Sequence, residues 1–149
     1  MLKAIDPLLG PDLLHTLRAM GHGDDLALVD ANFPAEAIAA ETKIGTCIRL
    51  DGIDIPTAAK AILSVLPLDS FVEAPVRRME VMGEPETIRP VHQDMQAAID
   101  AAEGRSWPMG SIERFAFYEE AKKAYAVVAT GDARGYGCFL LKKGVILAD

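Results

Sequence analysis

The feature that most constrains the fold is residues 124–129, an almost uniformly apolar run that reads Ala-Tyr-Ala-Val-Val-Ala. A strand with one face in water alternates apolar and polar side chains, and this run does not alternate. A continuous apolar run of this length is typical of a strand covered on both faces, as in a parallel sheet between helices. The run therefore predicts an α/β protein.

Further short apolar runs alternate along the chain with segments of helical periodicity, which favours a largely parallel sheet. In the clearest helix, residues 86–103, apolar side chains recur every three or four residues and Gly104 follows as a cap. We expect one three-layered domain over residues 1–149, with the sheet flanked by helices. The predicted strands are residues 26–29, 47–50, 76–82, 124–130 and 139–141, and the predicted helices are residues 11–20, 56–66, 86–103 and 117–123.

The formal net charge of −7 argues against nucleic acid as a partner, because binding to phosphates depends on lysine and arginine. The basic residues are scattered singly or in pairs and form no track. No stretch approaches the roughly 18 apolar residues of a membrane span, and the N-terminus lacks an apolar segment of signal-peptide length. We expect a cytoplasmic protein that binds neither nucleic acid nor a membrane.

The two cysteines, Cys47 and Cys138, lie far apart and belong to no CxxC motif or Cys/His cluster with the spacing of a metal site. A disulfide is disfavoured in a reducing compartment, and each cysteine is expected as a small buried hydrophobe. The sequence also contains no P-loop, no GxSxG and no HExxH motif. It therefore predicts neither a metal nor a cofactor.

One candidate for acid–base chemistry is the turn Gly21-His22-Gly23, between a predicted helix and a predicted strand. Glycine permits tight backbone conformations, so His22 would be presented from a short turn. Asp30 follows directly on the strand, where ligands of α/β folds usually bind. A histidine and a carboxylate on one small scaffold could form an acid–base pair. The alternative is a capping turn with a surface histidine and a loop aspartate.

A second candidate is the segment that carries Arg114 among Phe115, Phe117 and Tyr118. Aromatic faces and forked donors are groups that bind neutral sugars, the former against C–H surfaces and the latter to hydroxyls. The alternative is that the two phenylalanines are core residues and that Arg114 pairs with a surface carboxylate.

A third candidate is the glycine-rich stretch 131–138, between two apolar strands. It could present the hydroxyl of Tyr136 from a loop that ends at Cys138. The alternative is a turn with a packed tyrosine.

Three other residues are weaker candidates, with the two histidines expected to be solvent-exposed. His15 lies off the apolar stripe of the first helix, and His92 is expected on the polar side of the helix over residues 86–103. Trp107 could be a sugar platform, but packing at a loop or subunit contact is favoured.

The order and spacing of several segments form a pattern more specific than any one of them. These are residues 20–24 (Met-Gly-His-Gly-Asp), 30–34 (Asp-Ala-Asn-Phe-Pro), 66–73, 114–132, 136–138 and 141–145. On these segments the chain resembles the L-fucose mutarotase branch of the family that also contains D-ribose pyranase, almost from end to end.

The resemblance implies that His22 is the general acid and that Asp30 binds the substrate. Arg114 stands where the ribose branch has a histidine, which favours the fucose branch. Tyr118 matches a tyrosine of the fucose branch.

In the family's Tyr-x-Asn contact, the tyrosine corresponds to Tyr136 and the asparagine is replaced here by Cys138. A thiol is a poor substitute for an amide, which offers two donors and an acceptor. The substitution bears on which sugar is bound and how tightly.

The implied reaction interconverts the α and β anomers of a free monosaccharide by acid–base ring opening and closure, without a metal or redox cofactor. L-fucose or a related pyranose is expected as the substrate. The sequence leaves open a sugar-binding protein without catalysis and a pyranose–furanose isomerase of ribose. The resemblance also implies an α/β fold and ring-like homo-oligomers, often decamers, with pockets near subunit contacts.

Overall fold

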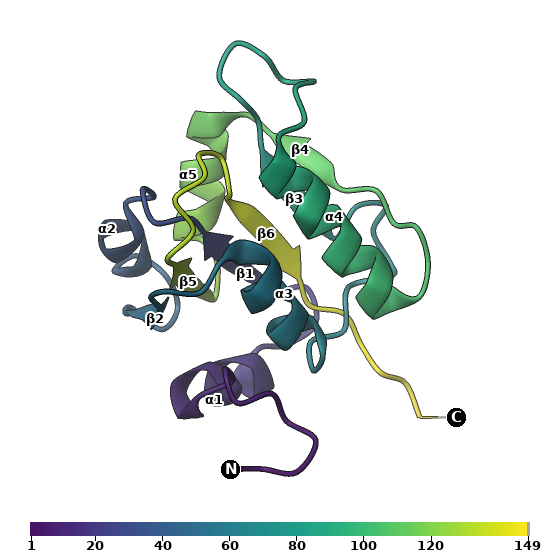
Figure 1. Ribbon diagram of the computed structural model, residues 1–149. Helices are drawn as coiled ribbons and strands as arrows, with labels where there is room; N and C mark the ends of the chain where they lie inside the picture. Colours follow the sequence, from purple (N-terminus) through teal and green to yellow (C-terminus); the bar gives the residue numbers. More distant parts are fainter. Residues whose placement is uncertain (149) are drawn as a thin grey trace.

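The computed structural model describes residues 1–148, which build one six-stranded sheet with helices on both faces (Figure 1). The strand order is β2-β5-β1-β6-β3-β4. The strands are β1 (Asp25–Val29), β2 (Cys47–Leu50), β3 (Val76–Met79), β4 (Gly110–Ile112), β5 (Ala126–Thr130) and β6 (Phe139–Lys142). Strand β5 comes from the apolar run, and all five of its residues are buried. It pairs in parallel with β1 and β2, as expected of a strand covered on both faces.

The sheet is mostly parallel, and β6 is the strand that runs against its neighbours. It pairs antiparallel with both β1 and β3, whereas β3 and β4 are parallel to each other. The amino end of β6 therefore lies at the same edge of the sheet as the carboxyl ends of the other strands. This reversal brings the glycine-rich loop before β6 next to the residues that follow β1.

Five helices cover the sheet: α1 (Pro11–Ala19), α2 (Ala35–Ala39), α3 (Ile55–Leu63), α4 (Pro90–Glu103) and α5 (Arg114–Lys122). Alternate residues of β1 enter different cores, since Leu26 and Leu28 pack with α1, α3 and α4, while Ala27 and Val29 pack with α2 and α5. In Figure 1, α3 and α4 lie side by side over one face. The predicted three-layered α/β fold is confirmed. Within residues 1–148, no helix is long and apolar enough to cross a membrane.

Several predicted boundaries were wrong. Helix α4 begins at Pro90 and not at residue 86, and Ile88 is half-exposed before it. Helix α5 begins three residues early, at Arg114, because the Glu113 carboxylate caps it by accepting the N–H groups of Phe115 and Ala116. The short elements α2 and β4 were not predicted, since five and three residues are too few to show a period.

The expectations for His15 and Trp107 are confirmed, and the one for His92 is wrong. His15 is exposed as expected, but His92 is fully buried and not on a solvated face. Trp107 is buried, and its indole N–H donates to the carbonyl of Glu73, which is a packing role. Both cysteines are free, Cys138 being buried and Cys47 only half-buried.

Candidate functional site

A cavity of about 250 Å³ lies at the sheet edge where β1 ends and β6 begins. This volume is just below the range of pockets for drug-sized ligands and is of a scale for one small ring. The cavity combines polar and aromatic side chains from three separate parts of the chain. Its lining residues are Asp30, Asn32, Phe33, Met79, Arg114, Tyr118, Gly135, Tyr136 and Cys138.

The five residues proposed from sequence to bind substrate therefore line one cavity, although 108 positions separate the first from the last. These residues meet because the directions of their strands bring the adjoining loops to one edge of the sheet. Asp30 follows the carboxyl end of β1, Arg114 begins the helix after β4, and Cys138 precedes the amino end of β6. Asn32, Phe33 and Met79 were not proposed. The first two stand in the same motif as Asp30, whereas only the pairing of β3 with β6 brings in Met79.

Asp30 is the organising centre of the cavity. Its side chain is buried, and Oδ1 accepts the N–H groups of Asn32 and Phe33 at 2.9 and 3.1 Å. Oδ2 accepts the N–H of Gly137 at 3.0 Å and the thiol of Cys138 at 3.4 Å. A carboxylate has about four lone-pair directions, and protein donors occupy all four. The weak, long thiol bond is the one that a sugar hydroxyl could displace most easily.

The Cys138 thiol is a donor and not a nucleophile. Burial raises its pKa well above the ordinary value, and the nearby Asp30 charge raises it further. The thiol therefore stays protonated at neutral pH, while a reactive cysteine needs the thiolate.

Arg114 and Tyr118 lie one turn apart on α5, and the Arg114 Nε–H donates to the Tyr118 hydroxyl at 3.3 Å. This bond raises the pKa of Arg114, so the guanidinium remains charged. Within residues 1–148 it forms no ion pair with a carboxylate. Its Nη1 makes only a long contact to the Met82 sulfur, at 3.7 Å, so the terminal nitrogens can donate to a ligand. Of the other aromatics, Phe117 is fully buried in the core and Phe115 is largely exposed, so neither lines the cavity. The apolar wall comes from Phe33 and Met79.

His22 lies elsewhere in the protomer. Its Nε2 is 3.1 Å from Oδ1 of Asp69, a buried carboxyl that was not proposed from sequence because 47 positions separate the pair. Burial alone would raise the pKa of Asp69, but hydrogen bonds from the Phe71 N–H and from His22 outweigh it and lower the pKa. The ionised Asp69 accepts a hydrogen bond from the Nε2–H of His22, which leaves Nδ1 free to exchange a proton with a ligand. The ring is 44% exposed and packs edge-on against Phe71 at 5.2 Å between centroids.

The single chain does not bring His22 to the cavity. His22 precedes the amino end of β1, and Asp30 follows its carboxyl end. A strand rises about 3.3 Å per residue, so the two ends of β1 are roughly 13 Å apart, which is beyond the reach of one imidazole.

Two further features bear on the chemistry. Within residues 1–148 there is no group of three histidine, cysteine or acidic side chains placed to hold a metal ion.

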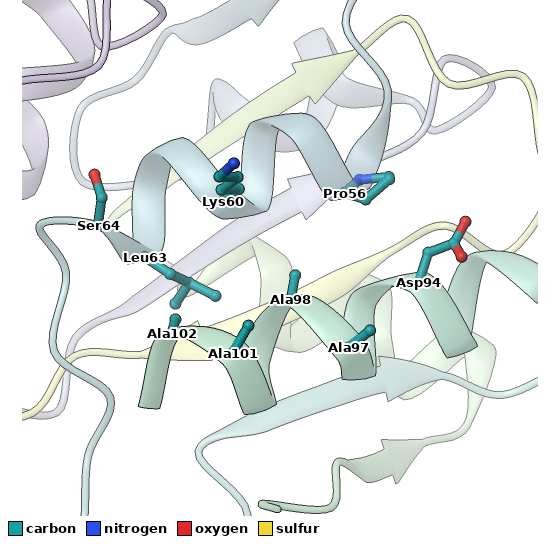
Figure 2. A pocket seen from close by; sticks show the side chains of 9 residues that line it. All are labelled: Pro56, Lys60, Leu63, Ser64, Asp94, Ala97, Ala98, Ala101 and Ala102. Carbon is teal, nitrogen blue, oxygen red and sulfur yellow. The ribbon is translucent and has the colours of Figure 1, made fainter. Parts of the chain in front are cut away.

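A larger groove of about 720 Å³ runs between α3 and α4 (Figure 2), where four alanines of α4 face Leu63 and the stem of Lys60. It contains no histidine or tyrosine, and its one carboxylate, Asp94, is bound to Arg134 at 2.6 Å.

The sequence profile of the RbsD / FucU transport protein family matches residues 3–146. The chain belongs to this family. A fucose mutarotase of Homo sapiens is 44% identical over 97% of this chain and 94% of its own length. The crystal structure of protein Atu2016 matches with a TM-score of 0.96 at 57% identity, covering 99% of this chain and 97% of that one. A fucose mutarotase from Streptococcus pneumoniae, solved in complex with L-fucose, matches with a TM-score of 0.87 at 38% identity, covering 98% and 100%.

Proposed function

We propose that the protein is an aldose mutarotase that interconverts the α and β anomers of free L-fucose or a closely related pyranose. The observation that carries the proposal is the single cavity formed by Asp30, Arg114, Tyr118, Tyr136 and Cys138, in a chain whose family includes a structure bound to L-fucose. The two free cysteines agree with a reducing cytoplasm as the place of action.

The reaction requires a proton on the ring oxygen and removal of the proton from the anomeric hydroxyl, so that the hemiacetal opens. The aldehyde then rotates and closes on its other face. His22 is the proton-transfer group in the proposal, because an imidazole can both donate and accept a proton and Asp69 orients this ring with Nδ1 free. Such assistance contributes about 10²–10⁴-fold, which suffices for a reaction that already proceeds in water.

The separation of His22 from the cavity leads to a second part of the proposal. Each working site combines the cavity of one copy with His22 of a neighbouring copy, so the active form is a homo-oligomer. A head-to-tail contact that repeats by rotation closes into a ring, in which every cavity is completed in the same way. A ring-based decamer is consistent with this arrangement.

Arg114 favours a fucose-like sugar over ribose. Its planar fork can donate to two neighbouring hydroxyls and cannot take part in proton exchange at neutral pH. Phe33 and Met79 provide an apolar wall that suits the methyl group of a 6-deoxy sugar. The rival function is sugar binding without turnover, which a dissociated protomer would show, since its cavity lacks His22.

The test is saturation-transfer NMR on L-fucose, D-ribose, D-galactose and L-rhamnose at equal protein concentration. We expect the fastest α–β exchange with L-fucose. Faster exchange of ribose would overturn the choice of sugar, and binding without exchange would establish the rival.

Co-expression of two inactive variants tests the shared site. His22→Gln spoils only the donated histidine, and Arg114→Gln spoils only the cavity. If one site draws on two copies, random mixing leaves about a quarter of the sites with both native parts, and activity returns to that level. If each site belonged to one copy, the mixture would remain inactive.

A further inference from the structure

The backbone of Tyr136 is strained at the wall of the cavity. Its φ is +66°, in the left-handed region that residues other than glycine rarely adopt. Such a conformation persists only where the surroundings hold it in place, and it tends to occur at functional sites. The contacts that hold Tyr136 therefore determine where its hydroxyl points.

The Tyr136 hydroxyl accepts the Met82 N–H at 3.3 Å, and a buried side chain, His92 on α4, holds the Tyr136 backbone. The imidazole is fully buried, and its Nε2 lies 3.0 Å from the carbonyl oxygen of Tyr136. Its Nδ1 accepts the N–H of Arg89 at 3.1 Å, so the proton must lie on Nε2, which donates to Tyr136. The ring of Phe139 stands perpendicular to the imidazole at 6.0 Å and fixes its plane. Burial lowers the pKa of His92, so this neutral tautomer persists at physiological pH.

The first turn of α4 holds the same loop at two further points. The Arg89 guanidinium carbon lies 5.0 Å from the centroid of the Tyr136 ring. At Gly137 an added Cβ would meet Val91 at 3.2 Å and Asp30 at 3.3 Å, so the backbone there is packed between α4 and β1. A shift of the Tyr136 carbonyl would consequently move the Gly137 N–H that Asp30 accepts.

We infer that His92 is a positioning residue, which holds the Tyr136–Cys138 segment in its sugar-binding conformation by donating from Nε2 to the Tyr136 carbonyl. The inference rests on the proposed function for its effect on sugar, since His92 itself does not line the cavity. It assigns a task in the site to a residue on a helix whose sequence pattern gave no hint of one.

Two substitutions separate this role from simple support of the helix. His92→Gln places an amide donor near the position of Nε2 and gives up the bond from Arg89. His92→Asn keeps an acceptor near the position of Nδ1 and gives up the donor to Tyr136. Gln93→Ala, at an exposed neighbour on α4, is the control.

We expect sugar binding to separate the two variants. His92→Gln should keep the L-fucose KM within about twofold, whereas His92→Asn should raise it roughly tenfold, as for one lost hydrogen bond, with a smaller loss in kcat. Urea unfolding should show a loss in both variants, because each gives up one of the two hydrogen bonds of His92. A KM raised equally in both variants would show that His92 only supports the helix, and the inference would be overturned.

A second readout needs no sugar. Amide hydrogen exchange at Gly137 should be faster in His92→Asn than in the wild type, and unchanged in His92→Gln and Gln93→Ala. Equal protection in all four proteins would overturn the inference. If the wild type exchanged no sugar anomers at all, the proposed function would fall, while the Gly137 measurement would still decide the role of His92.

Discussion

Replacing Asp30 with asparagine tests whether this carboxylate holds the cavity together. Each oxygen accepts two protein donors, so an amide nitrogen in either position faces two of them. The less costly orientation points the amide nitrogen at Gly137 and Cys138, because the thiol can rotate away. The buried Gly137 N–H then loses a bond to a charged acceptor and has no other partner. Together these losses should cost about 3 kcal/mol of the free energy of unfolding.

Urea denaturation followed by circular dichroism measures this loss. At an m-value of roughly 2 kcal/mol per molar urea, the midpoint should fall by about 1.5 M with an unchanged slope. Asp54→Asn is the matched control. Asp54 caps α3 by accepting the Thr57 N–H at 3.0 Å, and asparagine caps a helix equally well, so the midpoint should hardly move. Midpoints that agree for the two variants would refute the view that Asp30 is saturated by protein donors.

Three further predictions concern catalysis, pH and metals. His22→Gln should reduce anomer exchange at least about 100-fold with unchanged circular dichroism, whereas His15→Gln on the exposed face of α1 should not; equal rates would remove His22 from the mechanism. Hydrogen bonds from the Arg134 side chain lower the pKa of the buried Asp132 from 3.8 to about 2. The ionised carboxylate therefore stabilises the folded protein above pH 3.8, and this contribution is lost as the pH falls through 2. Asp132→Asn should be less stable than the wild type by about 2 kcal/mol at pH 7 and nearly equal to it at pH 2, and a gap that persists at pH 2 in urea unfolding would contradict this origin. Exhaustive chelation should leave anomer exchange unchanged, and a loss restored by one particular metal would show that the reaction depends on a metal ion.

The elements predicted correctly are those whose pattern depends on local physics. The apolar runs of β5 and β1 reflect burial on both faces of a sheet, which neighbouring residues in the chain record directly. Asp30, Arg114 and Tyr136 could likewise be singled out, because Asp30 follows a predicted strand, Arg114 stands among aromatic residues and Tyr136 lies in a glycine-rich stretch. Belonging to the RbsD / FucU family was also predictable, since it depends on the residues of several segments and on their order and spacing.

The burial of His92 could not be predicted from the local sequence pattern. Its position on α4 relative to the apolar stripe predicted a solvated face, because imidazole is polar and the helix is otherwise amphipathic. The structure buries it completely, since a loop 44 positions away supplies the carbonyl that satisfies its donor. Asp69 was missed for the same reason, because its partner His22 lies 47 positions earlier.

The sequence by itself determined the layers of the fold, five of the six strands and the chemical groups available for a site, because these follow from hydrophobic periodicity and residue type. Only the tertiary structure decided which groups meet. The reversed direction of β6 places Tyr136 and Cys138 beside Asp30, and the length of β1 keeps His22 at the opposite edge. Strand direction and pairing depend on contacts between residues distant in the chain, and a local pattern contains no record of them.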